Sequence, residues 1–175
     1  MQSILKNNSV EPGSEAGRGS SLRYLTFDLG RETFAMDIRS VREIIQFGPI
    51  TVVPLMPEFV RGVINLRGAV VPVIDLQSRF GRANAQVGKK TCIVIFDAVT
   101  EDDKVSLGLM VDAVSEVIDI KDDCIEPPPQ FGTSIDRDFI RGMGKVGNNF
   151  IVILELERAL NVEDMAGLTQ VLVNA

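Results

Sequence analysis

The stretch that decides the fold is Phe59-Val60-Arg61-Gly62-Val63, because it returns 80 residues later as Phe139-Ile140-Arg141-Gly142-Met143. The same offset places Ile74-Asp75-Leu76 on Leu154-Glu155-Leu156. Paired apolar positions arise often between β-rich segments, whereas the order aromatic, aliphatic, Arg, Gly, aliphatic is a rarer coincidence. The match therefore favours an internal duplication over chance.

A second offset, of 73 residues, relates an earlier part of each copy. Phe34-Ala35-Met36 falls on Leu107-Gly108-Leu109, and Val41 falls on Val114. The offset grows between the two blocks, which predicts an inserted loop at 130–137 in the second copy. Two copies of about 70 residues are too few for a solenoid or a propeller, which need several units. They predict two small β-barrels packed as a pair.

Turn signals and apolar periodicity divide the chain into a tail, two barrels and a helix. Residues 1–20 lack periodicity and predict a flexible N-terminal tail. Short alternating runs predict a first barrel over about 21–80 and a second over about 90–156. A polar, Ala/Gly-rich linker at 82–89 lies between them. Helical apolar spacing predicts a C-terminal helix at about 157–173.

The composition excludes several classes of function. The chain of 175 residues has no His, so it lacks a Ser–His or Cys–His nucleophile pair and any His metal ligand. Its formal net charge of -6 argues against nucleic acid, for which a basic face is the usual footprint. Cys92 and Cys124 form no CxxC pair and are predicted to be small core residues in a reducing compartment. No window reaches the roughly 18–20 apolar residues of a membrane span, which predicts a soluble, cytoplasmic protein.

Three motif-like patterns have structural explanations. Gly142-Met143-Gly144-Lys145-Val146-Gly147 spells a dinucleotide-binding motif, but a turn and a strand follow it, so the glycines are predicted to serve a hairpin. Asp102-Asp103 and Asp122-Asp123 lie in polar turns, which favours solvated residues over acid–base catalysis. Pro127-Pro128-Pro129 fits a polyproline ligand or a stiff crossover, and its repeat partner at 54–57 favours the crossover. No cofactor and no metal site is predicted.

Two charged residues are set among apolar ones. Arg67 lies at the tight turn Leu66-Arg67-Gly68 between two apolar strands, and Glu43 lies beside Ile44 and Ile45. They are either ordinary surface charges, which contribute only about 0–1 kcal/mol as an exposed pair, or polar anchors that fix the orientation of a partner. The sequence by itself does not bring them together.

These residues also carry a family resemblance. Residues 59–68, followed by Val71-Pro72-Val73-Ile74-Asp75-Leu76, resemble the signature of the CheW family of chemotaxis coupling proteins. Tyr24-Leu25-Thr26-Phe27, Val41-Arg42-Glu43-Ile44 and Leu109-Met110-Val111-Asp112-Ala113-Val114 match in the same order. The resemblance covers about residues 22–168 and implies a CheW-like domain at 21–175.

The resemblance implies a mainly β fold of two tandem five-stranded, SH3-like β-barrel subdomains with short helices and a C-terminal helix. It further implies a non-enzymatic adaptor that couples the cytoplasmic tips of methyl-accepting chemoreceptors to the regulatory domain of the histidine kinase CheA. The protein would then be cytoplasmic and associated with membrane-bound receptor arrays. A paralogous adaptor of a non-motility pathway, such as type IV pili or a biofilm system, is the alternative within the family.

Site residues follow from the same resemblance. The receptor hairpin is expected in the groove between the barrels, at Ile38, Val41, Glu43, Ile44, Gly62 and Arg67. The kinase is expected mainly on the second barrel, around Cys92 and Val117, with a further contact at Phe131. The family often has a basic residue before the Pro run, where this chain has Glu126, so the charge part of that further contact differs.

Two other classes of protein are alternatives to the adaptor. An enzyme that uses carboxylates alone would need clustered acids in a pocket. A piece of a larger signalling protein, such as the kinase itself or a fusion with a receiver domain, would need ATP-binding motifs and a phosphorylated His, or roughly another 120 residues. This sequence has no ATP-binding motif, no His and no such additional stretch.

Overall fold

The structure is a computed structural model that describes residues 20–99, 104–130, 135–161, 165 and 167. The predicted tail at 1–20 therefore lies outside the described residues except for Ser20. Of the predicted C-terminal helix, α3 (Leu156–Leu160) is described as one continuous element, and most of the remainder falls outside the described part.

Strands dominate the chain, as predicted from the alternating apolar runs. The first copy of the repeat forms β1 (Ser21–Leu29), β2 (Glu32–Asp37), the 3-10 helix η1 (Ile38–Ser40), β3 (Val41–Gln46), β4 (Val60–Leu66), β5 (Ala69–Asp75) and α2 (Leu76–Arg79). The second copy forms β6 (Cys92–Val99), β7 (Lys104–Val111), β8 (Ala113–Lys121), η2 (Asp122–Cys124), β9 (Ile125–Glu126), η3 (Arg137–Phe139), β10 (Ile140–Val146), β11 (Asn149–Leu154) and α3.

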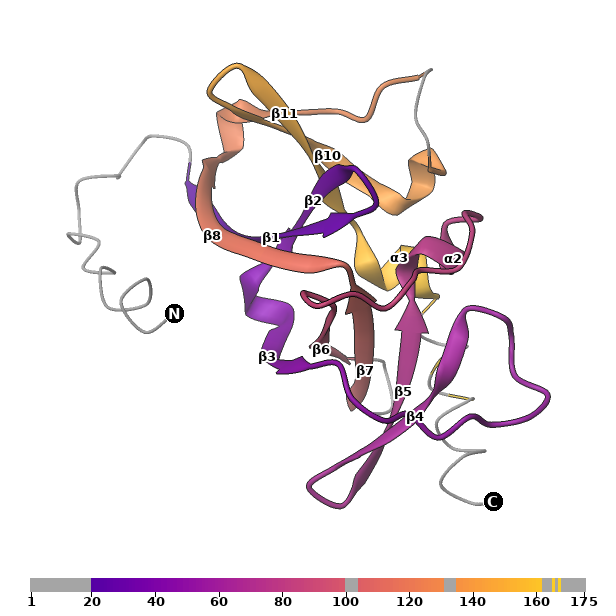
Figure 1. The fold of residues 1–175 in the computed structure, drawn as a ribbon. Coiled ribbons are helices and arrows are strands. Elements are labelled where there is room, and N and C mark those ends of the chain that lie inside the picture. The colour runs from indigo at the N-terminus through magenta and orange to yellow at the C-terminus, as the bar shows by residue number, and fades with distance from the viewer. Residues whose placement is uncertain (1–19, 100–103, 131–134, 162–164, 166, 168–175) are drawn as a thin grey trace.

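The strands form two sheets that we call sheet A and sheet B. Sheet A has six strands in the order β8-β1-β2-β11-β10-β9, and sheet B has five in the order β3-β6-β7-β5-β4. Sheet A occupies the upper half of Figure 1 and sheet B the lower half, with α2 and α3 between them at one side. Two five-stranded sheets were predicted, and the two-residue strand β9 is the addition in sheet A.

The two copies of the repeat exchange hairpins. The hairpin β1–β2 joins sheet A although the rest of its copy forms sheet B, and the hairpin β6–β7 joins sheet B although the rest of its copy forms sheet A. The predicted barrel ranges, 21–80 and 90–156, therefore do not coincide with the two sheets. Alternating apolar patterns define strands but do not say which strands pair, so the sequence pattern could not reveal this exchange.

Each sheet curls until its two edges meet. In sheet B the chain beyond β3 returns to the far edge, where the backbone N–H of Thr51 donates to the carbonyl of Val63 at 2.9 Å and the reciprocal bond measures 2.8 Å. In sheet A the same closure is made by β9, which follows β8 and pairs with β10. Closure satisfies the backbone groups that an open edge would leave unpaired.

The internal repeat is visible in the details of both sheets. β5 pairs in parallel with β7, and its counterpart β11 pairs in parallel with β2. Both β4 and β10 carry a register shift just before the repeated glycine, Gly62 or Gly142. The N–H of Asp75 donates to the carbonyl of Phe59 at 2.7 Å, and that of Glu155 donates to the carbonyl of Phe139 at 2.8 Å. The predicted insertion at 130–137 lies partly outside the described residues.

Steric crowding explains why a glycine follows the arginine in both copies of the repeat. A Cβ atom on Gly62 would lie 2.3 Å from the carbonyl oxygen of Thr51, and one on Gly142 would lie 2.9 Å from that of Glu126. Both contacts are with the backbone segment that closes the sheet, so a side chain at either position would push the closing segment away. The motif therefore marks the place where each sheet closes.

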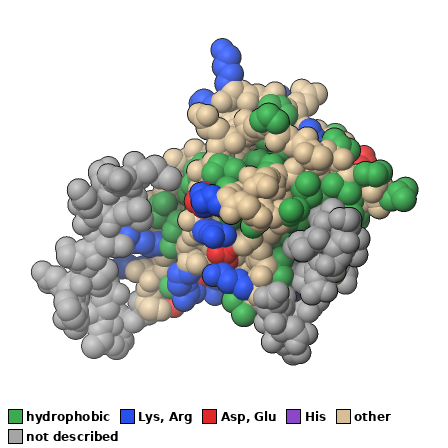
Figure 2. Space-filling model, turned by 90° about the horizontal axis from the view of Figure 1, so that it is seen from below, with side chains coloured by type: hydrophobic (Ala, Val, Ile, Leu, Met, Phe, Trp, Pro, Cys, Tyr) green, Lys and Arg blue, Asp and Glu red, His purple; other side chains and the backbone are tan. Residues whose placement is uncertain are grey.

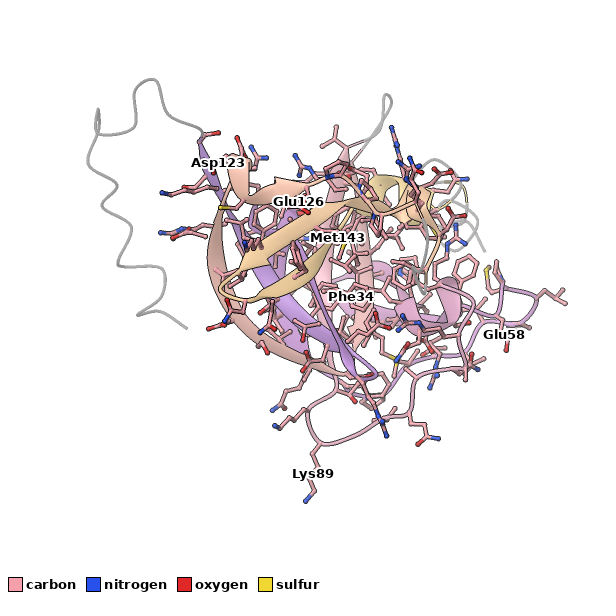
Figure 3. All side chains as sticks on the ribbon, turned by 90° about the horizontal axis from the view of Figure 1, so that it is seen from above. Phe34, Glu58, Lys89, Asp123, Glu126 and Met143 are labelled. Carbon is pink, nitrogen blue, oxygen red and sulfur yellow. The ribbon has the colours of Figure 1, made fainter. Side chains whose placement is uncertain are left out.

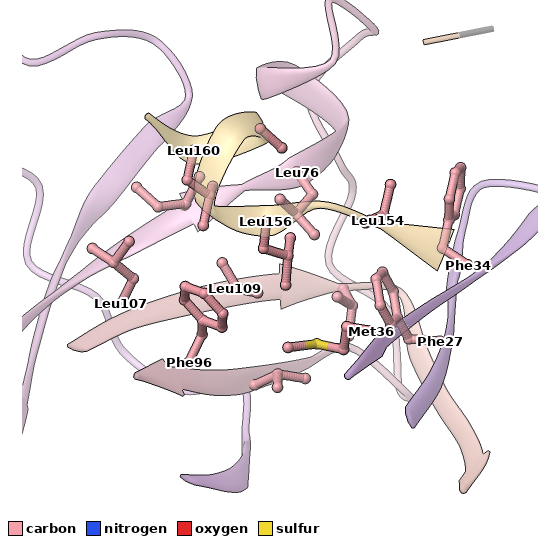
Figure 4. Packing of buried hydrophobic residues seen from close by; sticks show 14 of the residues in the cluster. Phe27, Phe34, Met36, Leu76, Phe96, Leu107, Leu109, Leu154, Leu156 and Leu160 are labelled. Atoms are coloured by element: carbon pink, nitrogen blue, oxygen red, sulfur yellow. The ribbon is translucent and has the colours of Figure 1, made fainter. Parts of the chain in front are cut away.

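The main hydrophobic core lies between the two sheets and draws residues from both, as Figure 4 shows for Phe27 and Phe34 of sheet A with Phe96 and Leu107 of sheet B. Smaller clusters fill each sheet's own interior, where Ile93 belongs to the cluster of sheet B. The strand β6 is apolar on both faces because its successive side chains point alternately into the main core and into the cluster inside sheet B. The shared core makes the two sheets one packed unit.

Candidate partner-binding site

Glu43 and Arg67, which the sequence by itself does not bring together, form an ion pair in the structure. The Nη2 group of Arg67 donates to Oε2 of Glu43. Glu43 lies on β3 and Arg67 in the turn between β4 and β5, at opposite ends of the strand order of sheet B. The pair therefore crosses the seam at which the sheet closes. The side chain of Arg67 is 64% exposed and that of Glu43 is 26% exposed, so the cation remains accessible to a partner.

A tight hairpin turn presents Arg67. Its φ of 52° and that of Gly68, 88°, are both left-handed, as the preferred two-residue hairpin turns require. The side chain of Asn65 stabilises the turn by accepting a hydrogen bond from the N–H of Gly68 at 2.9 Å. A residue with a Cβ atom costs about 1–2 kcal/mol in this conformation. The left-handed conformation at this position therefore presents an exposed cation although it destabilises the backbone.

The apolar residues expected at the receptor site lie next to this pair. Val41 and Ile44 of β3 and Ile38 of η1 are half-buried and pack on the main core between the sheets. Gly62 is buried on β4 under Thr51, where its part is to allow closure and not to offer a contact surface. The structure thus places Ile38, Val41, Glu43 and Ile44 along η1 and β3 at one edge of sheet B, where Arg67 contacts Glu43 from the turn between β4 and β5.

The residues expected at the kinase site are divided between the two sheets. Cys92 begins β6 in sheet B, whereas Val117 lies on β8 in sheet A, so the expectation that both belong to one barrel is wrong. Both are half-buried and pack against the same core as Val41. Burial raises the pKa of the Cys92 thiol, although a backbone hydrogen bond with Val114 opposes the shift. The thiol is therefore protonated at neutral pH and packs as a small apolar group. Phe131 lies outside the described residues.

The repeat also relates Val114, for which the sequence predicted no role, to the predicted contact residues. Val114 of β8 is the counterpart of Val41 by the 73-residue offset, and Val117 is the counterpart of Ile44. Val114 is half-buried on the same core and lies beside Cys92. The offset that revealed the duplication was the signal that would have found it.

The loop between β3 and β4 exposes two apolar side chains. Leu55 is fully exposed and has a φ of 64°, and Val52 is 76% exposed. On the face seen in Figure 2, hydrophobic side chains lie near a group of basic and acidic ones. Figure 3 shows Glu58 and Lys89 projecting from loops at the rim, while Phe34 lies inside the molecule. Exposed apolar residues that stand singly are normal on protein surfaces, so these two assign no function to the loop.

Chemistry other than binding has little support in the described part of the chain. No group of three or more His, Cys, Asp or Glu residues there is placed to hold a metal ion. None of its helices is long and apolar enough to cross a membrane. The Gly142–Gly147 stretch forms β10 and the turn into β11, with Gly147 at a φ of 60°, as the hairpin prediction required.

The sequence profile of the CheW-like domain family matches residues 23–164. The chain belongs to this family. It is 38% identical over 133 residues to the probable chemotaxis protein CheW of Rhizobium etli, across 76% of this chain and 83% of that protein. Chemotaxis protein CheW of Klebsiella aerogenes is 30% identical over 151 residues, across 86% of this chain and 89% of that protein.

A solved structure agrees with the sequence comparisons. The crystal structure of scaffolding protein TtCheW from Thermoanaerobacter tengcongensis matches with a TM-score of 0.70 at 38% identity, covering 80% of this chain and 88% of that one. The resemblance seen in the sequence is therefore confirmed, together with the mainly β fold. As a member of the CheW-like family the chain is a scaffold-type adaptor of chemotaxis signalling and not an enzyme.

Proposed function

We propose that this adaptor couples the cytoplasmic tips of methyl-accepting chemoreceptors to the regulatory domain of a CheA-type histidine kinase, at membrane-bound receptor arrays on the cytoplasmic side. The observation that carries the proposal is the Glu43–Arg67 pair, which lies beside the half-buried apolar residues of β3. These are the positions that the resemblance assigned to the receptor.

The chemistry of this surface suits a helical hairpin as partner. Ile38, Val41 and Ile44 offer apolar area, and each buried square ångström contributes about 25 cal/mol to association before the entropy costs. The charged pair fixes the register of the partner, since a shifted partner, or a correctly placed one that lacks its matching charge, is left with an unpaired polar group. Apolar contact with few polar anchors is typical of specific protein interfaces.

The kinase contact is proposed around Cys92 and Val117, with Phe131 as a further contact. Val117 is supported as a contact by its equivalence to Ile44, since a duplicated fold repeats its exposed edges. Because the two sets of residues pack against one core, a partner that alters side-chain packing at β3 acts on the residues that support β8. Control of the kinase then requires that the receptor contact differ between the kinase's two states.

The experiment that tests the proposal compares two substitutions. Val41→Lys should weaken capture of a receptor cytoplasmic fragment by at least about tenfold, which corresponds to 1.4 kcal/mol, and leave kinase capture unchanged. Val117→Glu should do the reverse. Both variants must keep the circular dichroism spectrum and the unfolding midpoint of a folded protein. Equal loss of both partners in a folded variant would contradict the two-surface arrangement.

Purification of the tagged chain from its own cells identifies the partners directly. Recovery of a chemoreceptor and a CheA-type kinase in one complex is the expected result. The identity of that receptor and kinase also distinguishes a motility pathway from a type IV pilus or biofilm pathway. Recovery of neither partner, under conditions that retain receptor arrays, would overturn the proposal.

A further inference from the structure

The 80-residue repeat places a basic–acidic pair at the same position in each copy. The first pair is Arg61 on β4 with Asp75 at the end of β5, and the second is Arg141 on β10 with Glu155 directly after β11. In both copies the acidic residue is the N-cap position of the short helix that follows, α2 or α3. The surroundings of the two pairs are nevertheless different.

The first pair holds a segment of the chain's own linker. The backbone N–H of Ala85 donates to Oδ2 of Asp75 at 2.9 Å, and Nη1 of Arg61 donates to the carbonyl of Ala85 at 3.2 Å. Arg61 also lies 3.4 Å from Asp75. Asp75 is completely buried and Ala85 is 7% exposed. The acidic and basic groups thus bind the N–H and the C=O of a single residue in an irregular segment.

The second pair lines an open cavity of about 440 Å³, which we call the Arg141–Glu155 cavity. Its walls are Asp37, Arg39, Ser40, Phe96, Arg141, Leu154, Glu155, Leu156 and Glu157. Arg141, Leu154, Glu155 and Leu156 are the repeat counterparts of Arg61, Ile74, Asp75 and Leu76. The volume is in the range of about 300–1,000 Å³ that ligand pockets occupy. Of the residues predicted for the receptor and kinase sites, the eight that the structure describes do not line this cavity.

Within the described residues, the carboxylate of Glu155 does not make the capping bond that its counterpart makes. Asp75 caps α2 by accepting from the N–H of Ser78 at 3.3 Å, whereas the side chain of Glu155 makes no capping bond to α3. Burial raises the pKa of Glu155, and a hydrogen bond and charge repulsion with Glu157 raise it further. Arg141 is directed to Asp37, at 3.7 Å, and its side chain is 41% exposed. Both members of the second pair therefore have binding capacity to spare.

We propose that the Arg141–Glu155 cavity binds an extended segment of a partner polypeptide through its backbone, with Glu155 accepting the N–H and Arg141 donating to the C=O of one residue. The pair Asp75 and Arg61 performs this recognition on Ala85 within the same chain. The walls combine Arg39 and Arg141 with Asp37, Glu155 and Glu157. A simple anion would meet three carboxylates there, whereas a peptide group, which both donates and accepts, matches the mixed lining. This inference does not depend on the proposed function.

The linker itself supplies the probe. The blocked peptide acetyl-Arg-Ala-Asn-Ala-Gln-Val-amide copies residues 82–87 and is titrated into the isotope-labelled full-length chain while amide chemical shifts are recorded. The expected result is a saturable shift of the amides of Arg141, Glu155 and Leu156. A peptide N-methylated at the alanine that copies Ala85 lacks the donor and should bind at least about tenfold more weakly.

Substitutions locate the binding and control for folding. Arg141→Ala and Glu155→Ala should each weaken binding of the peptide at least about tenfold while the remaining amide spectrum is retained. Glu126→Ala, which removes an exposed carboxylate on β9 outside the cavity, should leave binding unchanged. Undiminished binding to the folded Arg141→Ala variant would overturn the proposal.

Three other outcomes also overturn it. Shifts confined to Asp75 and Ala85 would mean that the peptide replaces the linker in the first site. Equal shifts produced by inorganic phosphate, with competition between phosphate and the peptide, would mean an anion site. Absence of any saturable shift at millimolar peptide would mean that the cavity does not recognise a backbone.

Discussion

Phe59 and Phe139, which occupy the same position in the two copies of the repeat, share one cation. The guanidinium carbon of Arg79 lies 5.1 Å from the ring centroid of Phe59 and 5.2 Å from that of Phe139. Arg79 belongs to α2, so this contact ties the first copy to the second at the place where both short helices meet the core. Its Nε atom is buried without a hydrogen-bond partner in the described part of the chain.

This geometry predicts that Arg79→Ala destabilises the fold. Each cation–π contact contributes about 0.5–2 kcal/mol, and loss of the buried stem adds to it, while removal of an unsatisfied buried N–H works in the opposite direction. We expect the free energy of unfolding in urea to fall by about 1–3 kcal/mol. Arg42→Ala, at an exposed position on β3, is the matched control and should change it by less than about 0.5 kcal/mol. A similar loss in both variants would contradict the role of the two rings.

Gly62 and Gly68 distinguish a steric requirement from a conformational one. Both have left-handed φ angles, 149° and 88°. A Cβ atom on Gly62 would overlap the backbone of Thr51 at 2.3 Å, whereas one on Gly68 meets nothing within 4 Å. Gly68→Ala should cost about 1 kcal/mol, from the backbone alone, and Gly62→Ala should cost about 3 kcal/mol or more because the closing segment must move. Urea denaturation measures the loss of unfolding free energy in both variants. Equal losses would mean that the backbone at Thr51 moves away from a side chain at position 62 without a measurable penalty.

The sequence predicted the elements of this fold better than their pairing. The two offsets correctly matched β2 with β7 and β4 with β10, because duplicated strands keep their apolar pattern. The exchange of hairpins between the copies was missed, since alternation specifies which face is buried and not which neighbour a strand finds. Pairing depends on long-range packing in the shared core, for which a single sequence carries no local signal.

The contacts of the linker could not be predicted from the sequence either. The sequence predicted a polar, Ala/Gly-rich linker at residues 82–89, yet Ala85 is buried and its backbone binds both Asp75 and Arg61. Backbone groups make these contacts, and every residue has them, so composition could not reveal the docking. The pair Glu43–Arg67 was visible in the sequence only as two charges in apolar surroundings. Closure of sheet B, which brings them together, was not visible there.

Glu155 and Asp37 predict opposite effects of pH on stability. Burial, and then Glu157, raise the pKa of Glu155 above its ordinary value of 4.5. The folded chain therefore holds this proton more tightly than the unfolded chain. Its contribution to stability is complete below pH 4.5 and is lost as the pH rises through the folded-state pKa. Glu155→Gln, which resembles the protonated form, should therefore gain stability relative to the native chain as the pH rises above 4.5.

Asp37 supplies the control of opposite sign. Burial opposes its ionisation, but hydrogen bonds from Arg39 and the charges of Arg39 and Arg141 outweigh it and hold the pKa below 3.8. Its contribution is present above pH 3.8 and is lost as the pH falls through the folded-state pKa. Relative to the native chain, Asp37→Asn should therefore be less stable at every pH above 3.8, and the difference should shrink as the pH falls through the folded-state pKa. Urea unfolding at each pH measures both differences, and a pH-independent difference for Glu155→Gln would contradict its raised pKa.

Arg67→Gly separates the cost of the turn from the use of the side chain. The substitution removes an exposed cation from a left-handed position that glycine adopts freely, so the fold should keep its stability or gain up to about 1 kcal/mol. The lost pair with Glu43 subtracts at most about 1 kcal/mol because Arg67 is largely exposed. Capture of a receptor cytoplasmic fragment should nevertheless fall at least about tenfold, while kinase capture stays constant. Because the variant is not expected to unfold, full receptor capture by Arg67→Gly would show that the side chain has no part in binding. Loss of both partners would instead place the turn at a surface that the receptor and the kinase share.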